Sequence, residues 1–236
     1  MTDTISPFRD FAPGTQPAYD VPAYGSTGLR HPTQPTLKIP QTVTELTGPR
    51  FDPVRFPVCA DMSIREGHAA LGERIILRGR VLDEDARPVR KTMVEVWQAN
   101  AAGRYDHAGD IHDAPLDTNF HGAATVYTDD DGWYEFTTIK PGAYPWRNHA
   151  NAWRPAHIHF SLFGPGFATR LVTQMYFPGD PLLALDPIFN GLPDRGARDG
   201  LVARFDLDVT RPDWALGYRW DIFLRGRAAT VMEGGA

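Results

Sequence analysis

The stretch GERIILRGRVLDEDARPVRKTMVEVWQAN, residues 72–100, decides the fold. It holds two runs rich in β-branched and other apolar residues, and the segment Asp83–Pro88 between them is made of residue types that favour turns. We interpret the stretch as a strand, a turn and a second strand.

The same pattern recurs along the rest of the chain. Residues 124–139 predict a further hairpin that turns at Asp129–Gly132, and helix is expected to be scarce and short, as near residues 181–185. Many short strands separated by turns predict a mainly β fold, an antiparallel β-sandwich with long active-site loops. The remaining strands are expected at residues 156–164 and 169–177, joined by a Gly-Pro-Gly turn, and at 202–209 and 218–226.

Residues 1–55 differ from this body, which we place at residues 56–236. They contain nine prolines, and each proline lacks a backbone donor and disfavours helix at the residue before it. Aromatic and aliphatic residues are spaced between these prolines, which a free tail does not require. The segment is therefore predicted to be an extended arm that docks on its own body or on a partner.

Composition excludes several classes of protein. The 236 residues carry 24 Lys+Arg against 29 Asp+Glu, a net charge of −5. This balance lacks the excess of basic residues that is typical of nucleic-acid-binding proteins. The single cysteine, Cys59, excludes an internal disulfide framework and any multi-cysteine metal site. No apolar run approaches about 18 residues and no secretory signal is visible, so we expect a cytoplasmic protein without a membrane partner.

The chemistry is predicted in two long connections, residues 100–121 and 140–156, and in the strand that follows them. His157 and His159 are two residues apart in that strand, so both imidazoles point to one face and form half of a metal site. A carboxylate could complete an Fe(II) triad. Tyrosine phenolate is a hard anionic donor that suits Fe(III), and Tyr105 and Tyr144 stand in the two connections. The candidate carboxylates are Asp106, Asp110, Asp113 and Asp117.

The segments around residues 97–105, 139–147 and 151–160 closely resemble the intradiol ring-cleavage dioxygenases. That resemblance implies a mononuclear non-haem Fe(III) held by Tyr105, Tyr144, His157 and His159. It makes Tyr144 the tyrosinate that leaves the metal when substrate chelates, and places Arg154 beside the substrate ring. The same comparison implies six substrate-binding residues: Tyr24, Trp97, Trp146, Gln174, Tyr176 and Ile188.

The resemblance also implies a reaction and a partner. The reaction is the opening of protocatechuate (3,4-dihydroxybenzoate) by O2 to 3-carboxy-cis,cis-muconate, a step of the β-ketoadipate route of aromatic catabolism. The partner is a homologous alpha subunit without the iron ligands, with the active site at the alpha–beta interface and several alpha–beta units in the assembly. Catechol and hydroxyquinol enzymes of the family carry a helical N-terminal region, which nine prolines in residues 1–55 forbid here.

Two other hypotheses remain open at this point. One is a two-histidine, one-carboxylate Fe(II) oxygenase, which would be nearly colourless. The other is a β-sandwich interaction subunit without a functional metal.

Overall fold

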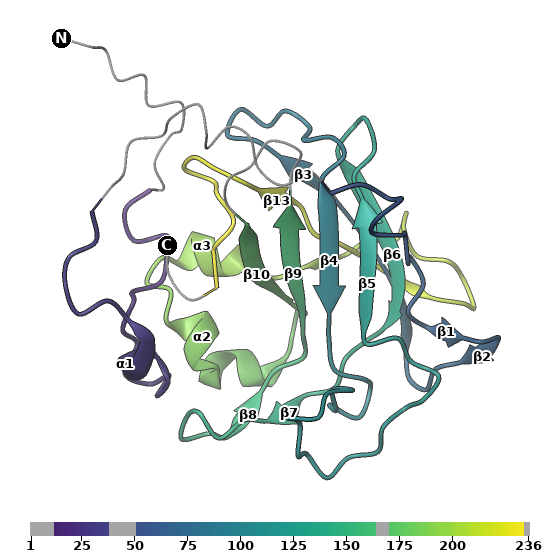
Figure 1. Ribbon diagram of the computed structural model, residues 1–236, viewed down its shortest axis with the longest axis horizontal. Coiled ribbons are helices and arrows are strands. Elements are labelled where there is room, and N and C mark those ends of the chain that lie inside the picture. Colours follow the sequence, from purple (N-terminus) through teal and green to yellow (C-terminus); the bar gives the residue numbers. More distant parts are fainter. Residues whose placement is uncertain (1–11, 38–50, 164–169, 234–236) are drawn as a thin grey trace.

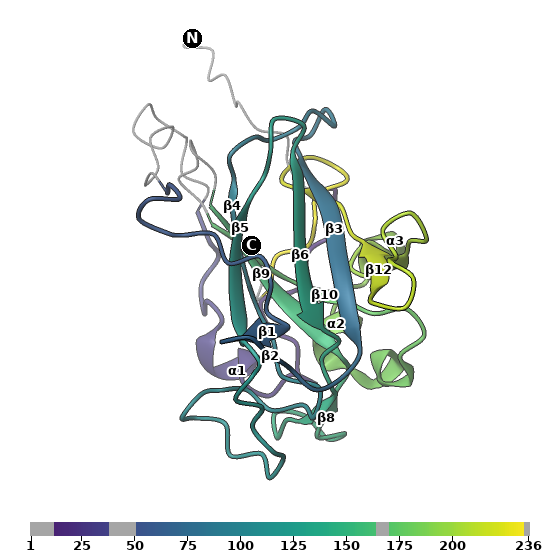
Figure 2. The ribbon, with the colours of Figure 1, turned by 90° about the vertical axis from the view of Figure 1, so that its right-hand side faces the viewer.

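The computed structural model describes residues 12–37, 51–163 and 170–233. Two sheets lie face to face across the centre of the body (Figures 1 and 2). The four-stranded sheet has the order β10-β9-β4-β5, formed by Leu171–Tyr176, His157–Phe163, Met93–Trp97 and Ala123–Tyr127. The five-stranded sheet contains β11-β12-β3-β13 and β6, formed by Arg204–Phe205, Leu216–Arg219, Arg74–Leu82, Ile222–Phe223 and Trp133–Ile139.

Small elements surround this sandwich. Two short ribbons are β1 (Ile64–Arg65) with β2 (His68–Ala69) and β7 (Tyr144–Pro145) with β8 (Trp153–Arg154). The helices are α1 (Thr27–Arg30), the 3-10 turn η2 (Pro181–Leu185), α2 (Pro187–Asn190) and α3 (Arg195–Asp199). Among the described residues, no helix is long and apolar enough to cross a bilayer.

The predicted β-sandwich is confirmed, but both predicted hairpins are wrong. Strands β3 and β4 lie in different sheets, and so do β5 and β6. After the turn at Asp83–Pro88 the chain therefore crosses from the five-stranded sheet to the four-stranded sheet. The apolar faces of β3 and β4 then point toward each other across the core, as in other β-sandwiches. The late strand expected at residues 218–226 divides into β12 and β13, both parallel to β3, so the sheet is mixed. The Gly-Pro-Gly turn lies outside the described residues.

The core fills the space between the two sheets. Phe160 on β9 is fully buried and contacts Tyr134 and Phe136 on β6, with ring centroids 5.9 and 6.1 Å apart. Its ring also lies 4.8 Å from that of Trp220. Alternation along β9 explains this position, because every second residue of a strand points to the same side.

The described part of the arm, residues 12–37, lies against the body. Asn148 accepts a hydrogen bond from the Ser26 backbone N–H at 2.9 Å and donates to the Ser26 hydroxyl at 2.9 Å. Gln16 accepts one from the Met232 N–H at 3.0 Å, so the arm also contacts the C-terminal segment. The boundary at residue 55 stays a prediction, since residues 1–11 and 38–50 are outside the described ranges.

Replacing Asn148 by alanine should loosen the arm without unfolding the body. The substitution removes two hydrogen bonds to Ser26, each contributing about 1 kcal/mol. We expect faster cleavage of the arm in limited proteolysis, with the melting of the body little changed. Asn151→Ala is the control, because the Asn151 side chain donates to the Trp153 carbonyl of its own loop at 2.9 Å and makes no hydrogen bond to residues 12–37. Equal cleavage rates in the two variants would refute this role.

Candidate functional site

The strand register assembles the site on the outer face of the four-stranded sheet. His157 lies opposite Tyr176 on β10, and His159 lies between Gln174 on β10 and Trp97 on β4. Residues opposite one another in antiparallel strands share a face, so these five side chains form two adjacent rows. The intervening residues of β9 face the core, which makes this strand buried on both sides.

Two loops bring the tyrosines over these rows. Tyr105 follows β4 in the connection 100–121, and Tyr144 begins β7, where it pairs with Arg154 of β8. The loops touch backbone to backbone: the Gly142 N–H donates to the Asn100 carbonyl at 3.0 Å. This hydrogen bond joins the two loops, which lie at the lower end of the sandwich in Figure 1.

Gly103 is required where the two loops meet. Its φ of +79° is a left-handed conformation, and a Cβ at this position would collide with the Ala143 carbonyl oxygen. We expect Gly103→Ala to lower the free energy of unfolding by more than about 1–2 kcal/mol, the cost of that conformation alone. Gly122→Ala is the matched control, since its nearest neighbour is 3.9 Å away and its φ is not positive. Urea unfolding of both variants tests this, and equal losses would contradict it.

Four aromatic rings converge at this point. Ring centroids lie 5.3 Å apart for Tyr105 and Tyr144, 5.4 Å for Tyr144 and His157, and 4.9 Å for His157 and His159. The circuit closes between Tyr105 and His159, at 6.4 Å. The Tyr144 hydroxyl is 3.4 Å from His157 Nε2. Two phenol rings and two imidazole rings thus lie around a common centre.

Burial sets the charge state of these groups. Burial, and then the neighbouring Tyr144, raise the pKa of Tyr105 well above its ordinary value. Burial also raises the pKa of Tyr144, but the Arg154 guanidinium opposes that rise. Burial, followed by Arg154 and His159, holds the pKa of His157 well below its usual range, so this imidazole is neutral. Its Nδ1 lies 2.7 Å from the Pro155 carbonyl and donates to it, which leaves the lone pair on Nε2.

These residues fit an Fe(III) ion. The buried Tyr105 hydroxyl has no hydrogen-bond partner among the described residues, although buried polar atoms are normally paired. A trivalent cation would offset the cost of ionising two buried phenols, because a bound cation lowers the pKa of the groups that coordinate it. Tyrosine and histidine are both known iron ligands.

A carboxylate-completed site is not formed. Within the described ranges, no group of three or more His, Cys, Asp or Glu residues could hold a metal. Asp110 accepts instead from the backbone N–H groups of Tyr105 and His112, both at 2.8 Å. Asp117 accepts from Leu71 N–H at 2.7 Å. Asp110 and Asp117 are therefore engaged by backbone N–H groups.

Arg154 lies beneath the four rings with only 2% of its surface exposed. Its Nη1 is 3.1 Å from His157 Nε2. Burial alone would lower its pKa, yet the charges of Tyr176 and Asp186 raise it well above its ordinary value. Arg154 is therefore a permanent cation at the edge of the site.

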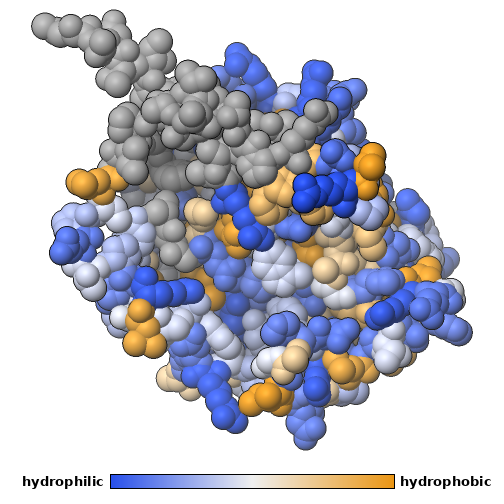
Figure 3. All heavy atoms as spheres, in the orientation of Figure 1, coloured by the Kyte–Doolittle hydropathy of each residue, from blue (hydrophilic) through white to orange (hydrophobic). Residues whose placement is uncertain are grey.

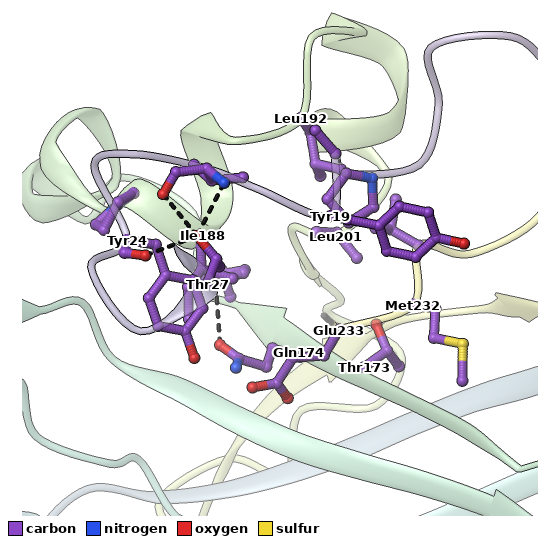
Figure 4. A pocket seen from close by; sticks show the side chains of 16 residues that line it. Tyr19, Tyr24, Thr27, Thr173, Gln174, Ile188, Leu192, Leu201, Met232 and Glu233 are labelled. Carbon is purple, nitrogen blue, oxygen red and sulfur yellow. Dashed lines mark hydrogen bonds between the residues drawn. The ribbon is translucent and has the colours of Figure 1, made fainter. Parts of the chain in front are cut away.

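The six predicted substrate-binding residues lie in two separate cavities. Trp97 and Trp146 line a groove of about 940 Å³ with Tyr105, Tyr144 and His159. Trp97 stacks on His159 with centroids 4.8 Å apart and planes 2° from parallel. The other four line a cavity of about 40 Å³ between the arm and the body (Figure 4): Tyr24, Gln174, Tyr176 and Ile188. Tyr24 and Trp146 connect the two, with ring centroids 4.9 Å apart.

Two carboxylates at the site were missed from the sequence. Asp186 is fully buried and forms an ion pair with Arg154 at 2.9 Å. Glu233 lies 3.4 Å from His159 Nδ1. Burial alone would raise the pKa of Glu233, but His159 and Arg154 hold it below its ordinary value. Neither position carries a local signal, because both reach the site only through tertiary folding.

Comparisons with known proteins agree with this architecture. The family model described as Dioxygenase matches residues 46–226, and the model for the N-terminal region of the protocatechuate 3,4-dioxygenase beta subunit matches residues 9–42. The chain is 57% identical to a protocatechuate 3,4-dioxygenase beta chain from Burkholderia cepacia, over 98% of each chain. It is also 34% identical to a protocatechuate 3,4-dioxygenase alpha chain from Pseudomonas putida, over 69% of this chain and 77% of the relative.

A solved structure gives the same result for the fold. The dioxygenase domain of a carbohydrate-binding fusion protein from Streptomyces sp. SirexAA-E superposes with a TM-score of 0.53 at 25% identity, covering 76% of this chain and 94% of that domain. The match to the family model and the full-length likeness to a curated relative leave one assignment. The chain belongs to the intradiol ring-cleavage dioxygenase family.

Proposed function

We propose that this chain is the iron-bearing subunit of an enzyme that opens protocatechuate between its two hydroxylated carbons. Both atoms of O2 enter the product, 3-carboxy-cis,cis-muconate. The substrate is taken from the name of the Burkholderia cepacia relative, which is 57% identical over almost the whole chain. The N-terminal match to the beta-subunit model supports the same substrate.

The observation that carries the proposal is the convergence of Tyr105, Tyr144, His157 and His159 around a buried, unpaired phenol. Together these four side chains would hold one mononuclear non-haem Fe(III). The bound ion supplies a site at which both oxygens of a catechol can be held as a dianion. Two phenolates favour Fe(III) over Fe(II), because each adds a negative charge.

The two tyrosines differ in a way that suits different roles. Tyr144 is next to Arg154, which opposes the rise of its phenol pKa, and its hydroxyl is 3.4 Å from His157 Nε2. Burial nevertheless keeps the pKa of Tyr144 above its ordinary value, so a Tyr144 phenolate released from the metal would readily take up a proton. The Tyr105 hydroxyl has no hydrogen-bond partner among the described residues, so its oxygen would have only the metal to bind. We therefore propose Tyr144 as the base that would accept a substrate hydroxyl proton and Tyr105 as the permanent ligand.

Arg154 stabilises negative charge on the substrate ring. If His157 held the metal through Nε2, no lone pair would remain there for an arginine donor, and Nη1 would be free to donate toward the substrate. Trp97 holds the plane of His159 by stacking. Trp146 is proposed to contact the substrate from the groove. Tyr24, Gln174, Tyr176 and Ile188 are proposed to contact it from the small cavity that adjoins the groove at the Tyr24–Trp146 contact.

We also propose a homologous alpha chain as partner, with the active site at the interface and several alpha–beta units in the assembly. The likeness to the Pseudomonas putida alpha chain supports a homologous partner. Ile111, which lines the groove, is 81% exposed, and Leu116 and Trp153 are 49% and 43% exposed. The lower end of the face in Figure 3 shows apolar residues among polar ones. Exposed apolar residues beside a site favour a protein partner.

The test is the visible absorption spectrum of the chain co-expressed with an alpha chain. Charge transfer from tyrosinate to Fe(III) should colour the protein. Anaerobic protocatechuate should shift the band, and O2 should then bleach it. A colourless protein with full iron occupancy would refute the tyrosinate ligands. A coloured protein that responds only to another catechol would refute the substrate alone.

A further inference from the structure

Asp186 occupies a position where an aspartate normally caps a helix, but it does not cap one. It precedes α2 as the N-cap residue, and its side chain makes no capping hydrogen bond. Asp180 and Asp194 in the same region do cap, accepting from Leu182 N–H and Ala197 N–H at 2.9 and 2.7 Å. An N-cap carboxylate usually stabilises its helix. Asp186 uses its carboxylate elsewhere.

That carboxylate holds Arg154 from one side. Its Oδ1 accepts from Arg154 Nε at 3.2 Å and its Oδ2 accepts from Nη2 at 2.9 Å, the two-point contact typical of arginine and carboxylate. Nη2 also donates to Gln174 Oε1 at 2.7 Å and to the Tyr176 hydroxyl at 3.1 Å. The Tyr176 hydroxyl lies 3.0 Å from Asp186 Oδ2, so it connects the two groups.

A count of the N–H donors of Arg154 shows which edge of its guanidinium is left to face the four-ring site. Arginine has five N–H donors in a rigid plane. The three on Nε and Nη2 are directed at Asp186, Gln174 and Tyr176. Nη1 alone faces the four-ring site, at 3.1 Å from His157 Nε2. The position of the Asp186 carboxylate therefore decides which edge of Arg154 faces the site.

The backbone around Asp186 is itself fixed. Its N–H donates to the Leu182 carbonyl at 3.0 Å, and its carbonyl accepts from the Asn190 N–H at 2.9 Å. Asp186 is fully buried, so its charge is shielded from water. A buried cation needs a fixed counter-charge. The nearby carboxylate of Glu233 faces His159 instead, at 3.4 Å.

We propose that Asp186 is a positioning residue of the reaction. It acts through Arg154 by fixing the guanidinium with Nη1 toward the substrate. This inference rests on the proposed function, because only a substrate at the four-ring site gives Nη1 an anion to stabilise.

The test is a double-mutant cycle in the alpha–beta holoenzyme. Asp186→Asn keeps the shape and one acceptor oxygen but removes the charge. We expect kcat to fall about 10–100-fold, with KM changed less than about threefold and iron content unchanged, since misplacement by about 1 Å can cost 10²-fold. In an Arg154→Met background the same change should alter kcat by less than about twofold, because the group that Asp186 positions is gone.

Asp194→Asn is the control, because Asp194 caps α3 and asparagine caps equally well. A full effect of Asp186→Asn in the Arg154→Met background would overturn the inference, and so would unchanged kcat in the single variant. If Asp186→Asn does not fold, Asp186→Glu replaces it in the cycle, since it keeps the charge and displaces it by one methylene. Wild-type protein without iron or colour would instead overturn the proposed function, which separates the two failures.

Discussion

Tyr105→Phe is expected to abolish both the visible colour and stable iron binding. The substitution removes one oxygen atom and keeps the ring that contacts Tyr144, with centroids 5.3 Å apart. The fold should therefore persist, and removal of the unpaired buried hydroxyl should leave the metal-free protein as stable as before or more so. Loss of an outer partner of a metal ligand already costs about 10–100-fold in affinity. Loss of a ligand should cost at least that much.

Iron analysis and the absorption spectrum of purified protein measure this effect. Tyr127→Phe is the matched control, because the Tyr127 hydroxyl donates to the Phe56 carbonyl at 3.0 Å, away from the site. That variant should keep full iron and colour. A Tyr105→Phe protein with normal iron content and an unchanged spectrum would show that the ligand assignment is wrong.

The sequence predicted the sandwich but not how its strands are shared between the sheets. The alternation in residues 74–82 and 93–97 shows that each is a strand with a buried face. It does not show whether the turn between them folds the second strand back beside the first or carries it to the opposite sheet. In the structure β4 pairs with β5 and β9, whereas β3 pairs with β6, β12 and β13, so the choice rests on strands outside this stretch. Local pattern contains no such information.

In the site, too, some residues could be predicted from the sequence around them and others reach their positions only through the fold. The spacing of His157 and His159 places both on one face of a strand, and the structure has them with ring centroids 4.9 Å apart. Tyr105 and Tyr144 could be singled out only through family resemblance, since a loop tyrosine has many ordinary roles. Asp186 gave no signal, because it resembles a helix cap and reaches Arg154 across 32 residues of sequence.

Arg154→Lys should lower kcat by about 10²–10³-fold while the protein still binds iron. Lysine keeps the positive charge but replaces a planar fork with a single point donor. The Arg154 guanidinium now contacts Asp186 through Nε and Nη2 and approaches His157 through Nη1, and one ammonium cannot reach both. Removing one preorganised donor from a developing anion typically costs about that factor, or about 3–4 kcal/mol.

The comparison of kcat with KM makes this prediction specific. If Arg154 acts mainly on charge that develops during ring opening, kcat and kcat/KM should fall together and KM should change little. Single-turnover decay of the coloured substrate complex after O2 mixing measures the chemical step directly. Arg170→Lys is the control, since Arg170 is half exposed and pairs with Glu95 at 3.8 Å on the same sheet.

Stability must be followed in parallel, because Arg154 is also the counter-charge of a buried carboxylate. Lysine retains that charge, so Arg154→Lys should lose less stability than Arg154→Met. Arg154→Met leaves Asp186 uncompensated and should cost about 3–5 kcal/mol. A lysine variant with normal kcat would restrict Arg154 to this structural role. A variant that loses kcat but retains iron, colour and melting temperature would place the guanidinium in the reaction itself.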